Sequence, residues 1–262
     1  MAKKNDDFTI CSLNLNGVRA AGKRGFTDWL AKTQPDHLCL QELRAMPDQV
    51  GDELRAPAGY GARWNPAEKK GYAGTAIYSR EVANRYRHGV GLDWADAEGR
   101  AVRADHDGLS VVSLYVPSGS SSEERQQRKF ESMEHLRGWF ARLLEEDRPI
   151  AVCGDVNIAH TPLDIHAPKR NEKNSGFLPE EREWFSGILE LGWVDVLREL
   201  HPETPGLYSW WSNRSRAREK DLGWRIDYVL ATPSLAARAR EAWIEKDADL
   251  SDHAPVWVRF ER

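Results

Sequence analysis

The sequence of 262 residues contains no apolar run close to the roughly 20 residues that a membrane-spanning helix requires. Its first ten residues, MAKKNDDFTI, hold no apolar stretch of signal-peptide length. Internal repeats and low-complexity tracts are absent as well. These absences favour a soluble, cytoplasmic protein without a membrane partner. The length suits a single domain of residues 1–262, with residues 1–7 as a flexible N-terminal extension.

Cysteine is scarce in this chain, with only three residues, and no CxxC pair occurs. Cys11, Cys39 and Cys153 lie far apart in apolar segments. A disulfide scaffold and a cysteine zinc site are therefore excluded. We expect all three cysteines to be buried, reduced thiols.

Positive charge is not in excess, because 37 Lys and Arg face 41 Asp and Glu, for a net charge of −4. This balance excludes a uniformly basic protein that coats nucleic acid. The basic residues are instead grouped in short stretches: Arg19, Lys23 and Arg24; Lys169, Arg170 and Lys173; Arg214, Arg216, Arg218 and Lys220. Such a local rim suits phosphate contacts, which should weaken as salt concentration rises.

Short apolar runs bounded by turn residues predict the β-strands of the chain. They lie at residues 8–13, 37–41, 74–78, 109–115, 150–153, 207–211, 225–230 and 256–260. Helices are predicted at residues 25–33 and 123–146, and a third begins at Pro179. The early alternation of strands and helices, followed by more strands, is typical of an α/β domain with a mixed sheet.

Polar side chains follow or precede most of these predicted strands. They are Asn14, Asn16, Glu42, Tyr115, Asp155, Asn157, Asp227, Asp252 and His253. An Asp or Asn alone at such a place is an ordinary turn or capping residue, Tyr115 alone is a core or rim aromatic, and His253 alone is a buried, hydrogen-bonded histidine. Ligands of α/β proteins bind at the carboxyl ends of strands, so together these residues predict one shared site.

The oxygen-rich composition of that site indicates a hard divalent cation such as Mg²⁺, which prefers carboxylates, amide oxygens and water. Glu42 and Asp155 would supply the carboxylates, and Asn14 and Asn157 the amide oxygens. The histidine and cysteine ligands of a zinc site are not grouped here.

Eight segments resemble, in order, the exonuclease III/AP endonuclease branch of the exonuclease–endonuclease–phosphatase superfamily. They are SLNLNGVRA, CLQE, LYVPSG, CGDVNIAHTPLDI, GFLPEEREWF, YSWW, GWRIDYVL and SDHAPV. The resemblance runs from Phe8 to the C-terminus. It implies a four-layered αββα sandwich, in which helices flank two packed, mixed β-sheets.

The same resemblance implies a Mg²⁺-dependent DNA-repair phosphodiesterase, with Mn²⁺ as a substitute ion. The expected substrate is duplex DNA, cut 5′ to an abasic site, with 3′-to-5′ exonuclease and 3′-end cleaning as candidate additional activities. We expect a monomer that needs no obligate protein partner.

The resemblance also implies roles for the residues at the strand ends. The implied metal ligands are Asn14, Glu42, Asp155, Asn157, Asp252 and His253. Asp155 would either deprotonate the attacking water or protonate the leaving group, and Asn157 would bind the water or a phosphate oxygen. Asp227 would orient His253 and favour its protonated form. Tyr115 would donate its hydroxyl to the scissile phosphate.

Substrate binding is expected at Asn16, Arg19, Trp210, Trp224 and Ile226. The two tryptophans match family segments that line a small pocket for a base-free deoxyribose. The flat walls of this pocket would exclude a normal nucleotide by its size. The alternative is that these tryptophans belong to the hydrophobic core, as most of the 11 in the chain must.

The sequence departs from the family pattern after the QE pair, where Leu43 and Arg44 replace a small hydroxyl residue and a lysine. Arg44 keeps the positive charge, whereas Leu43 loses a hydrogen-bonding group. This departure bears on the tuning of the metal site.

Two alternatives remain open at this point. The GFLPEEREWF, SWW and GWRIDY segments also resemble the catabolite repression control protein, a related RNA regulator without nuclease activity. That regulator has lost the acidic and amide residues of the site, whereas Glu42, Asp155, Asn157, Asp252 and His253 are present here. The second alternative is a superfamily enzyme for lipid headgroups or inositol phosphates, against which the YSWW and GWRID segments argue.

Overall fold

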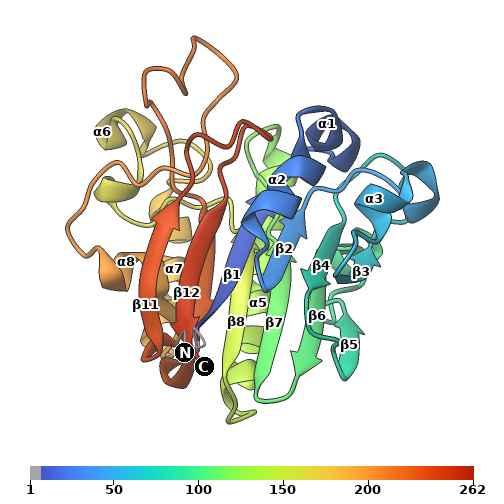
Figure 1. Ribbon diagram of the computed structural model, residues 1–262. Coiled ribbons are helices and arrows are strands. Elements are labelled where there is room, and N and C mark those ends of the chain that lie inside the picture. The colour runs from blue at the N-terminus through green and yellow to red at the C-terminus, as the bar shows by residue number, and fades with distance from the viewer. Residues whose placement is uncertain (1–6) are drawn as a thin grey trace.

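The structure, a computed structural model, describes residues 7–262 and contains two six-stranded β-sheets packed face to face (Figure 1). The strands of the first sheet are β1 (Asp7–Asn14), β2 (His37–Gln41), β3 (Gly61–Asn65), β4 (Thr75–Ser79), β11 (Ala239–Ile244) and β12 (Val256–Glu261). Those of the second are β5 (Arg85–His88), β6 (Ala101–His106), β7 (Leu109–Tyr115), β8 (Ile150–Asp155), β9 (Val194–Asp195) and β10 (Asp227–Ala231). The strand orders are β11-β12-β1-β2-β4-β3 and β5-β6-β7-β8-β10-β9.

Helices cover the outer faces of both sheets, which confirms the predicted αββα sandwich. They are α1 (Val18–Lys23), α2 (Phe26–Thr33), α3 (Asp52–Arg55), α4 (Asp93–Ala97), α5 (Glu123–Leu144), α6 (Pro168–Asn171), α7 (Pro179–Glu190), α8 (Val196–Leu200) and α9 (Pro233–Ala236). Short 3₁₀ helices lie at η1 (Pro47–Gln49) and η2 (Pro162–Asp164). Residues of α1, α2 and α3 pack on the first sheet, and those of α5 and α7 pack on the second.

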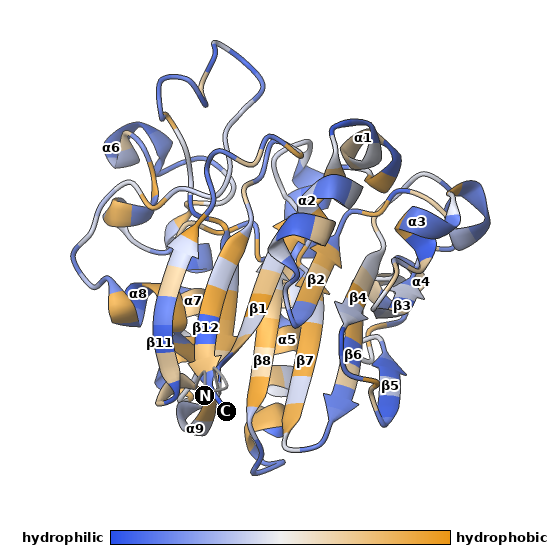
Figure 2. Cartoon of the chain, in the orientation of Figure 1, coloured by the Kyte–Doolittle hydropathy of each residue, from blue (hydrophilic) through white to orange (hydrophobic). Residues whose placement is uncertain are grey.

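The hydrophobic core has three apolar layers, one between the sheets and one under each helical layer. The central strands β1, β2, β7, β8 and β12 are mainly orange in Figure 2, whereas the edge strand β5 is blue. Strands β2, β4 and β7 are buried along their whole length. Strands that are covered on both faces form nearly continuous apolar runs, which is why the sequence pattern predicts them.

Helix α5 shows how the local sequence builds the outer layer over the second sheet. The Ser122 side chain accepts a hydrogen bond from the Arg125 amide and caps the N-terminus. Met133, Leu136 and Phe140 recur at spacings of three and four, and all are buried against the second sheet. The amphipathic pattern therefore decides which face of α5 meets the sheet.

The predicted strand at residues 207–211 is wrong. Trp210 makes only isolated bridges, one to Trp224 and one to His253. The amides of Ser209 and Trp210 both donate to the Trp224 carbonyl, at 2.9 and 2.8 Å. Successive residues of a strand do not share one acceptor in a regular ladder, so this segment forms a loop beside the end of β10.

Two predicted boundaries also shift. Strand β10 begins at Asp227 rather than at residue 225, because the Arg225 amide donates to the Asp164 carbonyl instead of a ladder partner. Asp7 does not belong to a flexible extension, since it pairs with Glu261 as part of β1. Residues 1–6 of that predicted extension lie outside the described residues. The edge strand β5, with the polar sequence RYRH, has no apolar pattern that could have predicted it.

No helix within residues 7–262 has the length and apolar character needed to cross a bilayer. Cys11, Cys39 and Cys153 are free and buried, which confirms their expected placement in the core.

We expect a large loss of stability when a smaller side chain leaves a cavity in the apolar layer between the sheets. Ile10 is fully buried there, so Ile10→Ala should lower the free energy of unfolding by about 2–5 kcal/mol. Val82 is 84% exposed, so Val82→Ala should change it by less than about 0.5 kcal/mol. Urea denaturation followed by tryptophan fluorescence measures both values. Equal values for the two variants would contradict the assignment of Ile10 to the central core.

Candidate active site

Strand register places three polar side chains in one row at the end of the second sheet. Tyr115 on β7 and Asp155 on β8 are direct partners in a parallel pair. Asp155 is also the direct partner of Asp227 on the antiparallel strand β10. Directly opposed residues of neighbouring strands point to the same face, so these side chains come together without any loop rearrangement.

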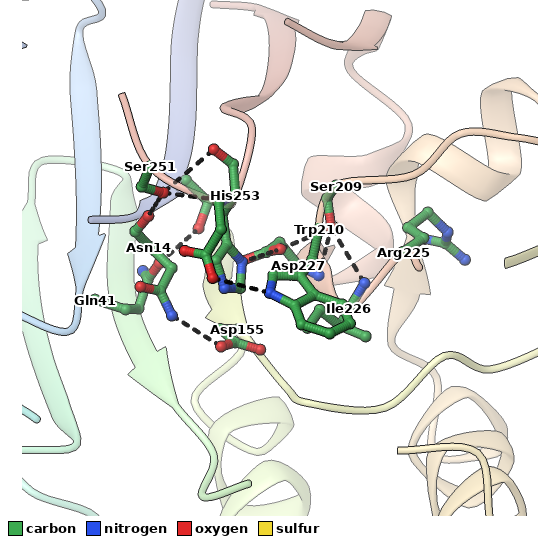
Figure 3. Close-up of polar contacts among 12 residues, drawn as sticks. Asn14, Gln41, Asp155, Ser209, Trp210, Arg225, Ile226, Asp227, Ser251 and His253 are labelled. Carbon is green, nitrogen blue, oxygen red and sulfur yellow. Dashed lines mark hydrogen bonds and ion pairs between the residues drawn. The ribbon is translucent and has the colours of Figure 1, made fainter. Parts of the chain in front are cut away.

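The first sheet brings its own residues to the same end of the sandwich. Asn14 ends β1, and Glu42 follows β2 with a positive φ of 52°. The side-chain nitrogen of Asn14, Nδ2, donates to Glu42 Oε1 and to Asp155 Oδ2, both at 2.9 Å. Asn14 is fully buried, so this single carboxamide ties the ends of the two sheets together (Figure 3).

Asp227 and His253 form a buried pair, with 2.8 Å between Oδ2 and Nδ1 (Figure 3). Burial opposes the charged imidazole, but the Asp227 carboxylate, its hydrogen bond and the nearby Asp155 raise the pKa of His253 to about 10. The imidazole therefore holds its second proton at neutral pH. Ser209 donates its hydroxyl to the same Asp227 oxygen at 2.7 Å, and accepts from the Asp227 amide at 3.1 Å.

Asp155 lies at the centre of the site and is almost fully buried. Its Oδ1 accepts the Asn157 amide at 2.8 Å, and its Oδ2 accepts the Asn157 carboxamide at 3.1 Å. Burial and the Asp227 carboxylate raise the pKa of Asp155 to about 8, with Glu42 adding to the rise and His253 opposing it. Burial and the crowding of negative charge together make this carboxylate unusually basic.

The residues of this cluster suit a hard divalent cation. Ligand atoms of Glu42, Asp155 and His253 all lie within 4.8 Å of one another. Asp227 Oδ1 is buried and has no hydrogen-bond partner within residues 7–262. A cation would relieve the crowding that raises the pKa of Asp155. A protonated imidazole has no lone pair to offer, so the carboxylate oxygens are better ligands than His253.

Asp252 lies beside this cluster rather than within it. Its Oδ1 accepts the Asn16 carboxamide at 2.8 Å, and its Oδ2 accepts the Trp210 indole at 3.2 Å. Asp252 thus orients two residues of the cleft wall. Arg44 forms an ion pair with Glu42, so its positive charge compensates one oxygen of this carboxylate.

A cleft of about 940 Å³ opens above these groups. The predicted residues that line it are Asn16, Glu42, Tyr115, Asp155, Asn157, Trp210, Trp224, Ile226, Asp252 and His253. Asn14 and Asp227 are fully buried and support these residues through hydrogen bonds. Arg19 is exposed on α1 and lines a different hollow, beside Leu54 of α3, so the structure does not bring it to the cleft.

The Tyr115 ring packs against the buried guanidinium of Arg100. The Arg100 guanidinium lies 4.7 Å from the ring centroid and donates to the Tyr115 carbonyl at 3.1 Å. Burial and the nearby Glu42 raise the pKa of Tyr115 well above its usual range. The phenol therefore keeps its proton and remains a hydrogen-bond donor at neutral pH.

Trp210 and Trp224 form an apolar corner of the cleft. Their rings meet edge to face, with 6.0 Å between centroids, and both are only partly buried. Ile226 packs in the same cluster, backed by Phe177. Trp211, by contrast, is only 2% exposed and belongs to the core.

Several residues that support the site, among them Ser209 and Arg225, are not predicted from the sequence. The Arg225 side chain is fully buried and contacts Asp164 and Asp195, each at 2.7 Å. Arg198 forms a further ion pair with Asp164. An arginine inside the apolar segment GWRIDYVL was the available signal, because a charge in a buried strand needs a partner.

The amino-acid sequence is similar to one family of known proteins over nearly its whole length. The model of the endonuclease/exonuclease/phosphatase family matches residues 11–253. The exodeoxyribonuclease of Bacillus subtilis is 38% identical over 248 residues, which cover 94% of this chain and 97% of that protein. The zebrafish (Danio rerio) DNA repair nuclease APEX1 is 35% identical over 254 residues, covering 95% of this chain and 81% of that protein.

Solved structures show the same similarity in three dimensions. An AP endonuclease from Archaeoglobus fulgidus superposes with a TM-score of 0.88 at 31% identity, covering 97% of this chain and 100% of that chain. The 3′ phosphatase NExo from Neisseria, bound to a product DNA hairpin, superposes with a TM-score of 0.89 at 28% identity. That match covers 97% of this chain and 100% of the Neisseria chain.

The Asp164–Arg225 pair beneath the site predicts a specific dependence of stability on pH. Burial alone would raise the pKa of Asp164, but Arg225 and Arg198 hold it far below its usual range. This stabilisation is complete above the unfolded carboxyl pKa and is lost as pH falls towards the lower folded value. Asp164→Asn should therefore cost about 3–5 kcal/mol at pH 7. Its deficit relative to wild type should shrink by about 1.4 kcal/mol per pH unit below about 4.

Urea denaturation at pH 7, 4 and 3 measures that deficit. Asp52→Asn is the matched control, because the Asp52 side chain is 82% exposed and its removal should give no such trend. A deficit of Asp164→Asn that stays constant across this range would show that the Asp164 charge does not contribute in the expected way.

Proposed function

The chain belongs to the endonuclease/exonuclease/phosphatase family, and from that premise we propose the reaction of its cleft: hydrolysis of a DNA strand 5′ to an abasic site. It is a nuclease of the exodeoxyribonuclease and AP endonuclease type. Its substrate is DNA, in line with the relatives and the DNA-bound structural neighbour. Exonuclease and 3′-phosphatase activity are the additional reactions that such relatives perform.

One observation carries the proposal: a buried carboxylate cluster and an apolar tryptophan corner line the same cleft. Glu42 and Asp155 supply the groups that phosphodiester chemistry requires. Trp210 and Trp224 supply a flat-walled space beside them. The relatives reported above are nucleases, and nothing among them supports a non-catalytic RNA regulator.

Enzymes of this family depend on a metal ion, and the carboxylates of this chain suit one. We propose Mg²⁺ as the ion, with Mn²⁺ as a substitute, held by Glu42 and Asp155. When bound, such a cation neutralises charge on the phosphate and stabilises the leaving oxygen.

His253 and Tyr115 are proposed to hold the scissile phosphate. His253 is protonated through its contact with Asp227, so its imidazolium donates to one phosphate oxygen. Tyr115 keeps its phenolic proton and donates to another. These donors stabilise the charge that develops at phosphorus, and Ser209 keeps Asp227 in place beneath His253.

Asp155 is proposed as the general base. Its buried carboxylate lines the cleft and is ionised once a cation compensates the neighbouring acids, so it takes a proton from the attacking water. Asn157 keeps the carboxylate oriented, because it donates to both Asp155 oxygens. The Asn157 side chain also donates to the Val116 carbonyl, which fixes the amide in the cleft.

The corner made by Trp210, Trp224 and Ile226 is proposed to receive the flipped-out abasic sugar. The rings present apolar, flat faces to a sugar that lacks its base. We propose that the same flat walls exclude a normal nucleotide by size. Asn16, held by Asp252, lies on the cleft wall and is proposed to contact the DNA backbone. We further propose that residues 1–262 act as one domain and as a monomer.

Replacement of Asp155 tests the proposed reaction. Asp155→Asn keeps the shape of the side chain but cannot accept the proton. We expect its cleavage rate to fall by a factor of about 100 to 10,000. The measurement uses a labelled duplex with one abasic analogue, in Mg²⁺ or in EDTA. The matched control is Asp107→Asn, an exposed aspartate at the opposite end of β7, which should cleave like wild type.

The wild-type lanes of this assay decide between the alternatives. No metal-dependent cleavage by the wild-type protein would overturn the nuclease assignment. Cleavage of undamaged 3′ ends, without incision at the abasic analogue, would remove the proposed specificity and leave an exonuclease.

Replacement of Trp224 tests the sugar pocket. Trp224→Leu opens one wall, so the preference in kcat/KM for abasic over undamaged DNA should fall by about 10- to 100-fold, in line with the energy of an apolar contact. The control is Trp243→Leu, which alters a partly buried tryptophan at the far edge of the first sheet. An unchanged preference in Trp224→Leu would place the sugar elsewhere.

A further inference from the structure

Helices α5 and α7 each bury one charged side chain in their contact. Lys129 and Glu181 are both fully buried, with 2.7 Å between Nζ and Oε1. Removing two charges from water costs more than their attraction generally returns, and an apolar pair of similar size is often as stable or more so. The attraction between the two charges therefore does not by itself explain this pair, and its other hydrogen bonds show which segments it holds.

Lys129 reaches the site through the backbone of Asn157. Its Nζ donates to the Asn157 carbonyl at 2.7 Å. Asn157 has a positive φ of 56°, a conformation that needs support from its surroundings. This residue donates both its amide and its carboxamide to Asp155. Lys129 thus anchors the residue that orients the central carboxylate.

Glu181 holds the facing wall of the cleft. Its Oε2 accepts the Gly176 amide at 2.6 Å and the Leu178 amide at 3.1 Å. The Leu178 contact is ordinary capping of α7, whereas the Gly176 contact lies beyond the helix. Gly176 and Leu178 both line the cleft, so the carboxylate fixes the backbone of this wall directly.

Gly176 carries that support to the tryptophan corner. It has a positive φ of 94°, and a Cβ there would lie 2.9 Å from the Trp224 ring and 3.2 Å from the Asn157 carbonyl oxygen. The Gly176 carbonyl also accepts the Ala159 amide at 2.8 Å. The Gly176 backbone is therefore packed directly against the Trp224 indole, and any shift of this backbone moves the wall.

We propose that the Lys129–Glu181 pair is a positioning device, which sets the orientation of Asp155 through Asn157 and the place of Trp224 through Gly176. The inference rests on the proposed function, since it assigns the pair to catalytic rate and to abasic specificity. Neither side chain is among the residues that line the cleft. They act only through the segments that they hold.

The double variant Lys129→Met/Glu181→Leu separates positioning from stability. Apolar replacement of both charges removes their desolvation cost, but it leaves the Gly176 amide and the Asn157 carbonyl without these partners, so the urea midpoint should fall. Under conditions well below that midpoint, where the variant is folded, a purely structural pair would leave the kinetic constants unchanged. We expect instead that kcat falls by about 10- to 100-fold, as for other residues that orient metal or catalytic groups. We also expect the ratio of kcat/KM for abasic over undamaged duplex to fall.

The control is Glu146→Gln, which breaks the Arg103–Glu146 ion pair at the other end of the second sheet. It should lower the urea midpoint and leave both kinetic measures at wild-type values. Hydrogen exchange of the metal-free proteins gives a readout independent of activity. Peptides that contain Gly176 should exchange faster in the double variant, because the Glu181 acceptor is gone.

The possible outcomes are distinct. Wild-type kinetic constants and unchanged exchange at Gly176 in the folded double variant would overturn the inference. If wild type itself does not cleave the abasic duplex, the proposed function fails, while the exchange experiment still tests the positioning. If the double variant does not fold, Glu181→Gln takes its place. It keeps an oxygen for Gly176 but loses the charge that holds Lys129, so lowered kcat supports the inference and wild-type kcat overturns it.

Discussion

The crowding of buried carboxylates where the two sheets meet is the constraint on which the rest of the site depends. Glu42 comes from the first sheet, and Asp155 and Asp227 from the second. Negative charges this close repel one another unless donors or a cation compensate them. Asn14, His253 and the other donors around them supply part of this compensation. The negative charge that these donors leave uncompensated, together with burial, raises the pKa of Asp155. The same uncompensated charge suits a divalent cation.

The sandwich produces this crowding through its strand directions. Each sheet contains one parallel pair, β1 with β2 and β7 with β8, and the carboxyl ends of both pairs lie at the same end of the molecule (Figure 1). Site residues therefore come from both sheets without long loops. The turns that follow these strands hold Asn16, Glu42 and Asn157 at positive φ. Such backbone conformations persist only where the surrounding contacts support them, as Lys129 does for Asn157.

Much of the fold and site followed from local patterns, and the misses have physical causes. Buried strands such as β2 and β7 are continuous apolar runs, so they and the polar residues at their ends were predictable. The loop around Ser209 has a strand-like composition but bonds to Trp224 in an irregular way, which no local pattern encodes. Arg19 has the charge expected of a substrate contact, yet it lines a separate hollow beside Leu54 of α3. Lys129 and Glu181 appear as ordinary charged helix residues until α5 and α7 are packed together.

The sequence alone determined the kinds of groups available, the absence of excess positive charge, and the strand ends at which carboxylates and amides appear. Composition and charge are fixed by the residue types themselves, and the position of a strand end depends only on neighbouring residues and on the period of a strand. All of these are local properties. The tertiary structure alone decided which of these groups meet and which of them hold a proton. The pKa values of Asp155 and His253 depend on burial and on charges supplied by distant segments, and such distances exist only after folding. The net charge of −4 thus became informative once its acids were located, with several of them gathered in a single cleft.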